Sequence, residues 1–147
     1  MHHDRAAVAS PIVEPTLPIL HLSLPVRDLA EARDFYVDVL GCRLGRSADE
    51  GADVWFYGLQ LTLQNRPDEV LPDRQRGVRH FGVTLSRADL TDLLGKLDQH
   101  SVTWLERVHT DHAGTPKEQT KAKFLDPSGN AIEIKTYADL RAGLQAI

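Results

Sequence analysis

An internal repeat constrains the fold of this chain more than any other feature of its sequence. Residues 19–26 alternate polar and apolar side chains and then enter a helical pattern, and residues 78–85 do the same. His21 and His80 occupy matching positions in the two segments. Because such short alternation is typical of a half-buried strand, the chain is expected to contain two similar modules, each beginning with a strand and a helix.

Each expected helix has apolar residues spaced three and four apart, which indicates one buried face. The first is predicted over residues 29–40, with Asp28 as its N-cap and Gly41 ending it, and the second over residues 88–99. Further strands are expected after each helix, at residues 53–57 and 59–64 in the first module and at 103–108, 122–125 and 131–137 in the second. The fold class is therefore α+β.

The domain organisation follows from these patterns. Residues 109–119 are expected to be an irregular loop, and the turn-forming residues 126–130 predict a hairpin connection. We expect a flexible N-terminal leader at residues 1–18, one domain at 19–137 with modules at about 19–65 and 78–137 joined by a linker at 66–77, and a C-terminal helix at 138–147.

Composition excludes several classes of function. The 147 residues carry a net charge of −4 and no basic run, which argues against a nucleic-acid partner. No apolar stretch approaches the roughly 20 residues of a membrane-spanning helix, and the N-terminus lacks a signal-peptide core. Cys42 is the single cysteine, so an intramolecular disulfide is excluded and its expected role is packing. We therefore expect a cytoplasmic protein with no membrane partner.

Three ionisable side chains are predicted to leave the apolar faces of their strands. Alternation places His21 opposite its neighbouring leucines, His80 opposite Phe81, and Glu133 opposite Ile132 and Ile134. Each alone reads as an ordinary polar residue on a solvated face. If the two sheets curve toward each other, however, two imidazoles and one carboxylate converge, and that set binds a divalent metal while leaving open positions.

Several motifs resemble one known superfamily. Residues 20–26, Asp28-Leu29 and the pattern Phe35-Tyr36 to Leu40-Gly41 resemble the opening of the vicinal oxygen chelate superfamily. Its members include glyoxalase I, type I extradiol dioxygenases, methylmalonyl-CoA epimerase and the fosfomycin and bleomycin resistance proteins. Residues 79–83 and 124–133 resemble the start and end of its second module, so the resemblance covers residues 19–137.

The resemblance implies a specific architecture and metal site. Two βαβββ modules would form a curved sheet cleft, the glyoxalase/bleomycin resistance/dihydroxybiphenyl dioxygenase fold, around a divalent metal. The implied ligands are His21, His80 and Glu133, with Fe(II) or Mn(II) favoured and Ni(II) or Zn(II) possible. At the level of a fourth ligand the chain offers Gln60, Thr62 and Gln64, where glyoxalase I has a glutamate. A weak contact from Gln60 or Gln64 stays open.

The absence of that glutamate favours a three-ligand site like that of extradiol dioxygenases. We therefore predict a metal-dependent enzyme that chelates a small organic substrate through neighbouring oxygens, most simply an extradiol dioxygenase. The alternatives are a glyoxalase-like lyase or isomerase and a metal-free drug-binding resistance protein. The resemblance also implies a homodimer, and it leaves open whether modules pair within one chain or between two.

Three further residues are candidates for acid, base or orienting roles near a bound substrate. Tyr137 is expected to face the same way as Glu133, and His109 and His112 lie in the predicted irregular loop. Gln119 and Lys121 are candidates for substrate contact.

Overall fold

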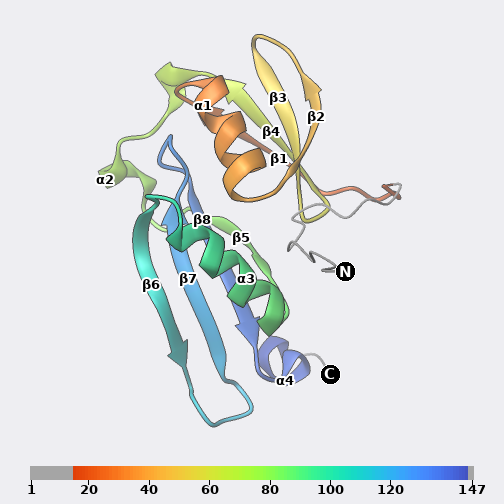
Figure 1. Ribbon diagram of the computed structural model, residues 1–147, viewed down its shortest axis with the longest axis vertical. Coiled ribbons are helices and arrows are strands. Elements are labelled where there is room, and N and C mark those ends of the chain that lie inside the picture. The colour runs from red at the N-terminus through yellow and green to blue at the C-terminus, as the bar shows by residue number, and fades with distance from the viewer. Residues whose placement is uncertain (1–14, 146–147) are drawn as a thin grey trace. The chain divides into compact units, whose positions relative to one another are not determined.

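The computed structural model describes residues 15–145 and shows two compact units (Figure 1). One unit runs to Gly77 and includes the turn Pro127–Asn130, and the other comprises Val78–Asp126 and the residues from Ala131 onward. Most of the predicted leader lies outside the described residues. None of the helices in the described part of the chain has the length and apolar character needed to cross a membrane.

The first unit is one four-stranded sheet with a helix. Its strands lie in the order β1-β4-β3-β2, with β1 parallel to β4 and the other pairs antiparallel. Tyr36, Phe56, Leu61 and Leu63 are fully buried in its core. In chain order the elements are β1 (His21–Val26), α1 (Leu29–Asp34), the π-helical η1 (Phe35–Val39), β2 (Arg43–Ser47), β3 (Gly51–Phe56), β4 (Leu59–Asn65), the short 3-10 turn η2 (Pro67–Glu69) and α2 (Asp73–Arg76).

The second unit repeats this topology. Its strands lie in the order β5-β8-β7-β6, and β5 is again parallel to the strand beside it. In chain order the elements are β5 (Phe81–Thr84), α3 (Arg87–Asp98), β6 (Thr103–Asp111), β7 (Gln119–Leu125), β8 (Ala131–Tyr137) and α4 (Leu140–Leu144). The α+β class and the two βαβββ modules predicted from the sequence are thus confirmed.

Local signals explain where the elements begin and end. The Asp28 carboxylate accepts a hydrogen bond from the Glu31 amide at 2.9 Å, as an N-cap should. The helical segment ends before Gly41, whose φ of 77° is left-handed. Tyr57 and Gly58 both have positive φ, which suits the two-residue turn between β3 and β4. The second helix begins one residue earlier than predicted, because Ser86 is its cap.

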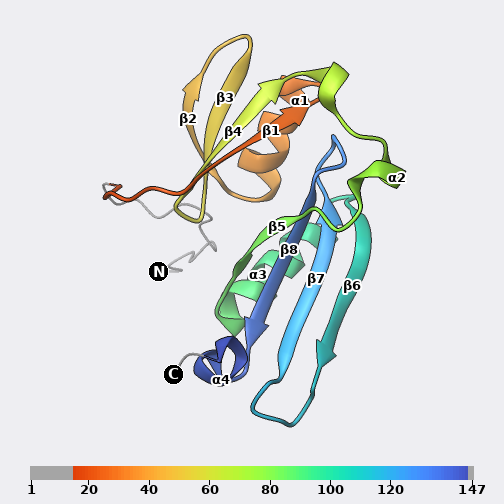
Figure 2. The same cartoon turned by 180° about the vertical axis from the view of Figure 1, so that it is seen from behind.

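Alternation divides the second sheet into a buried and an open face. Along β8, Ile132, Ile134 and Thr136 are buried, whereas Glu133 and Lys135 are only half-buried. Helix α3 lies across the buried face (Figure 1), and the view from behind shows the face that it leaves open (Figure 2). Burial of the apolar side chains beneath α3 fixes this register, because a slip of one residue would turn every side chain over. The predicted facing of Glu133 is confirmed.

Several elements differ from the prediction. Strand β2 was not predicted, because it is a wholly exposed, polar edge strand that contains a glycine. The irregular loop predicted at 109–119 is shorter, since β6 continues to Asp111 and β7 begins at Gln119. The linker at 66–77 contains short helical segments. Helix α4 occupies Leu140–Leu144 of the closing helix predicted at 138–147, and residues 146–147 lie outside the described part of the chain.

Candidate functional site

A histidine and a glutamate meet at one end of the second sheet. His80 immediately precedes β5, and Glu133 lies on β8, the parallel neighbour of β5. The register pairs Phe81 with Ile132, which brings the side chains of His80 and Glu133 together on the open face. His80 Nε2 lies 2.8 Å from Glu133 Oε2, and the two side chains are 34% and 15% exposed.

The hydrogen bond at Nδ1 of His80 determines whether Nε2 of the same ring acts as a donor or an acceptor. His80 Nδ1 lies 2.7 Å from the carbonyl oxygen of Val78, and a carbonyl only accepts, so Nδ1 carries the donated hydrogen. The lone pair of Nε2 then points at a carboxylate oxygen, which is also an acceptor. Two acceptors in contact repel each other, so the contact is favourable only when a proton on Nε2 or a metal ion bound by both groups supplies a positive charge. Neutral imidazole and carboxylate are metal-ligand types, and a carbonyl bond at Nδ1 is the usual way a ligand histidine is oriented.

His21 has the same bond in the first unit. Its Nδ1 lies 3.1 Å from the carbonyl oxygen of Gln60, which leaves Nε2 available as an acceptor. The side chain is exposed at the start of β1, as the alternation predicted. Within residues 15–145, no three His, Cys, Asp or Glu side chains come together as a metal-binding group. The structure thus brings His80 and Glu133 together, and His21 as a third ligand stays a prediction.

An open hollow of about 230 Å³ lies beside the His80–Glu133 pair. Strand β5, His80, Glu133 and Lys135 line it. Gly82 is directly opposite Glu133, and a Cβ at this position would lie only 1.8 Å from the carbonyl oxygen of Glu133. Only glycine therefore allows β5 to pair with β8 in this register and hold His80 against the carboxylate.

Strand pairing arranges the open face in rows. Glu133 is paired across the strands with Lys123. The next row contains Lys135, Lys121 and His109, and the third contains Tyr137, Gln119 and Asp111. Of the predicted candidates, Tyr137, His109, Gln119 and Lys121 therefore share the face that carries Glu133. Successive rows are two residues apart, which is about 7 Å along a strand.

Ion pairs neutralise most of the charge on this face. Lys121 Nζ lies 3.1 Å from Asp111 Oδ2, and Lys123 Nζ lies 3.6 Å from Glu106 Oε1. The hydrogen bond from Lys121 lowers the pKa of Asp111, and the same bond raises the pKa of Lys121. His109 donates from Nδ1 to the Arg107 carbonyl at 2.9 Å, and its Nε2 lies 3.7 Å from Asp111.

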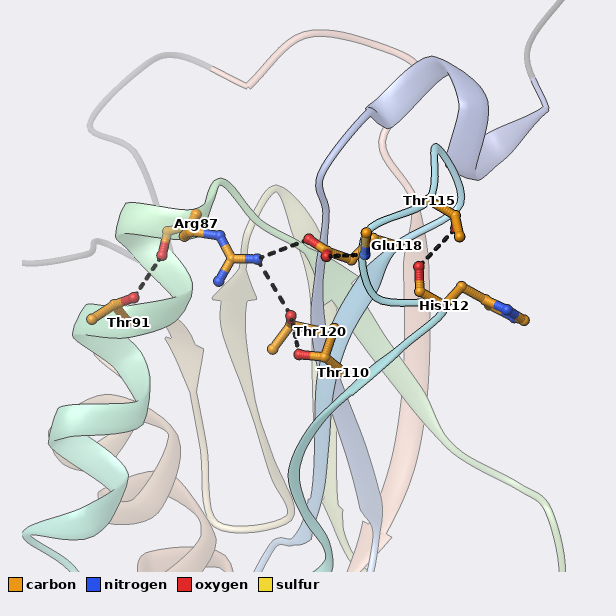
Figure 3. A network of polar contacts seen from close by, with 8 residues as sticks. Arg87, Thr91, Thr110, His112, Thr115, Glu118 and Thr120 are labelled. Carbon is orange, nitrogen blue, oxygen red and sulfur yellow. Dashed lines mark hydrogen bonds and ion pairs between the residues drawn. The ribbon is translucent and has the colours of Figure 1, made fainter.

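His112 lies apart from the His80–Glu133 pair. It follows β6 at the tip of the hairpin, beyond the Tyr137 row, and its backbone carbonyl accepts from the Thr115 hydroxyl at 2.7 Å. Near this tip, Arg87 contacts Glu118 and Thr120, and the hydroxyls of Thr120 and Thr110 are hydrogen-bonded (Figure 3). The imidazole of His112 points away from that network in Figure 3. Its predicted catalytic role has no partner among these contacts.

The candidate fourth ligands of the first unit are held by their neighbours. The amide of Gln60 lies 3.4 Å from Asp53 Oδ2, and the Thr62 hydroxyl donates to Asp53 Oδ1 at 2.7 Å. The amide of Gln64 donates to the Ser23 hydroxyl. Asp53 is 6% exposed, so the first sheet does contain a sheltered carboxylate on the face of Gln60, but on β3 rather than β4.

The sequence analysis missed four residues that shape these surfaces, namely Gly82, Lys123, Lys135 and Asp53. Gly82, Lys123 and Asp53 take their places from cross-strand register, which no local pattern shows. The parity of Lys135 with Glu133 was the one signal in the sequence that could have identified one of them.

Comparison with known proteins gives consistent results. The profile of the Glyoxalase/Bleomycin resistance protein/Dioxygenase superfamily matches residues 18–134. A catechol-2,3-dioxygenase of Bacillus subtilis is 32% identical over 125 residues, covering 81% of this chain but only 40% of that protein. The metallothiol transferase FosB of Lysinibacillus sphaericus is 29% identical, with 80% of this chain and 81% of that protein covered.

A solved structure agrees with these sequence comparisons. The glyoxalase/bleomycin resistance protein/dioxygenase from Alicyclobacillus acidocaldarius superposes with a TM-score of 0.77 at 31% identity, covering 86% of this chain and 96% of the other.

Proposed function

Because the chain belongs to the glyoxalase/bleomycin resistance protein/dioxygenase superfamily, we propose that it is a metal-dependent enzyme acting on a small organic molecule that offers two neighbouring oxygens. The single observation that carries this proposal is the His80–Glu133 pair. Its geometry places two acceptors 2.8 Å apart, with Nδ1 already committed to the Val78 carbonyl. A divalent cation satisfies both acceptors at once.

The residues present fit such an ion. His80 Nε2 and the Glu133 carboxylate would hold it, and His21 is the proposed third ligand, with its Nε2 left free by the bond to Gln60. Two imidazoles and one carboxylate suit Fe(II) or Mn(II), and Ni(II) or Zn(II) also accept these ligands. A metal bound there supplies a Lewis acid that stabilises negative charge developing on the substrate oxygens.

The chain's own residues would orient the substrate and move its protons. Tyr137 lies two rows from Glu133 on the open face, and its ring packs against Gly143, at which a Cβ would lie 2.2 Å from the ring. We propose the Tyr137 hydroxyl as the acid–base group. His109, in the Lys135–Lys121 row, is the second candidate, with its tautomer fixed by the Arg107 carbonyl.

Ring cleavage of a catechol is the reaction proposed first. The catechol-2,3-dioxygenase relative and the predicted three-ligand set support it, although this chain spans 40% of that relative. Strand β4 has Gln60, Thr62 and Gln64 in place of a carboxylate for glyoxalase-type isomerisation, and their side chains are bonded to Asp53 and Ser23. The FosB relative, of which this chain covers 81%, favours metal-dependent thiol transfer as the second candidate.

Metal content tests the proposal directly. Protein purified without chelators or a metal-affinity tag should carry about one ion per chain, measured by elemental analysis. His80→Ala and Glu133→Ala should lose it, whereas His100→Ala, at an exposed histidine after α3, should keep it. Iron or manganese leads to assays with catechols and oxygen uptake, and nickel or zinc leads to isomerase and thiol-transfer assays. Protein that takes up no metal even after reconstitution would refute the proposal and leave a small-molecule binding protein.

Two further parts of the proposal are tested separately. If His21→Ala binds the metal as tightly as the unmodified protein, the third ligand is wrong while the His80–Glu133 pair stands. We also propose a homodimer, for which light scattering should give twice the mass of the chain. Leu20 and Val78, each just before the first strand of its module, are 73% and 89% exposed and would suit burial at such an interface.

A further inference from the structure

Among residues 15–145, Lys135 is the lysine of the open face that has no acidic partner. Lys121 is paired with Asp111 and Lys123 with Glu106, as described above. Among residues 15–145 no carboxylate forms an ion pair with Lys135, and its ammonium lies instead 5.5 Å from the centre of the Tyr137 ring. Unlike the charges of Lys121 and Lys123, the positive charge of Lys135 is therefore not neutralised by an ion pair.

The position of Lys135 links that charge to the proposed metal site. Lys135 is two residues beyond Glu133 on the same face of β8, which is about 7 Å along the strand. It lines the same hollow as His80 and Glu133. Its partner on β5 is Thr84, a hydroxyl-bearing residue that also lines the hollow. A cation and a hydroxyl side by side are a suitable pair for an anion.

The neighbouring charges explain why Lys135 stays unpaired. It is directly opposite Lys121 in the sheet, and two like charges at opposed positions disfavour each other. Asp111 compensates Lys121, not Lys135. Glu133 is turned to His80 and would be occupied by a bound ion. A negative group on the ligand is thus the missing partner for the Lys135 ammonium.

We infer that the substrate is a flat ring compound with an acidic substituent. Its carboxylate or similar anion lies on the side of the ring opposite the two oxygens that the metal would hold. Lys135 binds the anion, Thr84 adds a hydrogen bond, and the Tyr137 ring lies beside the ligand. This inference rests on the proposed function and narrows the proposed substrate from any chelating diol to a catechol with an acidic group on the ring. Lys135 is a specificity residue in this account and is not a metal ligand.

The test compares a charged ligand with its neutral methyl ester. Protocatechuate, a catechol with a ring carboxylate, and its neutral methyl ester are titrated calorimetrically into metal-loaded protein under argon, so that binding is measured without turnover. The acid should bind at least about tenfold tighter, which is about 1.4 kcal/mol, because the bond between the Lys135 ammonium and the carboxylate is charge-assisted. Lys135→Met should remove the preference and Lys135→Arg should restore it. Lys117→Met, at an exposed lysine of the hairpin tip, is the control and should keep it.

The outcomes separate this inference from the proposed function. Equal binding of acid and ester by metal-loaded protein refutes the role of Lys135 and leaves the metal site standing. A loss of affinity for both ligands in Lys135→Met, with the ratio unchanged, also refutes it, because the residue would then act only through packing. If the protein binds no metal, the proposed function fails and the inference fails with it.

Discussion

Gly82 connects the packing of the second sheet to the geometry of the proposed metal site, so Gly82→Ala is a sharp perturbation of both. The added Cβ would lie 1.8 Å from the carbonyl oxygen of Glu133 and 2.7 Å from its carbonyl carbon. Carbon atoms in contact normally stay about 3.5 Å or more from other heavy atoms, so the two strands must separate by well over an ångström. Because backbone atoms cannot rotate away, the cost should reach the upper end of the overpacking range, about 3 kcal/mol.

The same movement would pull His80 away from Glu133. His80 directly precedes the four-residue pairing of β5 with β8, and Glu133 lies within that pairing, opposite Gly82. Displacing a group that positions a metal ligand typically lowers affinity by about 10- to 100-fold, and we expect a loss of that size for the metal that the unmodified protein binds. Urea unfolding gives the change in stability, and competition with a chromogenic chelator gives the change in metal affinity.

Gly95→Ala is the matched control. Gly95 lies within α3, and a Cβ there would meet no atom within 4 Å. Alanine should therefore stabilise the protein by about 0.5–1 kcal/mol through helix propensity and leave metal affinity unchanged. The reasoning is refuted if Gly82→Ala unfolds at the same urea concentration as the unmodified protein. If it is destabilised but binds metal normally, the packing argument holds and the link to the site is wrong.

Other predictions concern single local features. Burial raises the pKa of the Cys42 thiol to about 12, so a thiol reagent should modify it at pH 8 only after unfolding. Since the folded state favours the neutral thiol, this contribution to stability should be complete below pH 9 and disappear as the pH rises toward 12 in alkaline melts. Asp28→Ala and Ser86→Ala each remove an N-cap and should cost about 1 kcal/mol in urea unfolding. Thr62→Val removes the 2.7 Å donor of the buried Asp53 carboxylate and should cost about 1–3 kcal/mol, whereas an unchanged melting curve would contradict that role.

The sequence predicted the topology well because both modules have a strong period. Alternation along residues 19–26 and 131–137 predicted which side chains leave the core, and the facing of His21 and Glu133 followed directly. Elements without a clear hydrophobic pattern were harder to predict. Strand β2 is exposed along its whole length, and the polar end of β6 is an edge stabilised by pairing with β7, so neither has a hydrophobic face that a pattern could show.

Register was the main quantity that the sequence could not supply. Lys123 lies beside Glu133, and Lys135 between Lys121 and Thr84, only because β7 and β5 pair with β8 at specific residues. That choice depends on the turn at 126–130 and on how α3 covers the sheet, which are long-range properties. Asp53 was missed for the same reason, since its partners Thr62 and Gln60 lie on the next strand.

Within the described part of the second unit there are two histidine–carboxylate pairs, and their surroundings distinguish them. In both, Nδ1 is fixed by a backbone carbonyl, so a fixed tautomer alone does not identify a metal ligand. His109 Nε2 lies 3.7 Å from Asp111, and the Lys121 ammonium already neutralises that carboxylate at 3.1 Å. Glu133 is more sheltered, at 15% against 38% exposed, and within the described residues no lysine or arginine pairs with it. An added cation therefore has more charge to neutralise between His80 and Glu133, and a metal should bind there before it binds at His109.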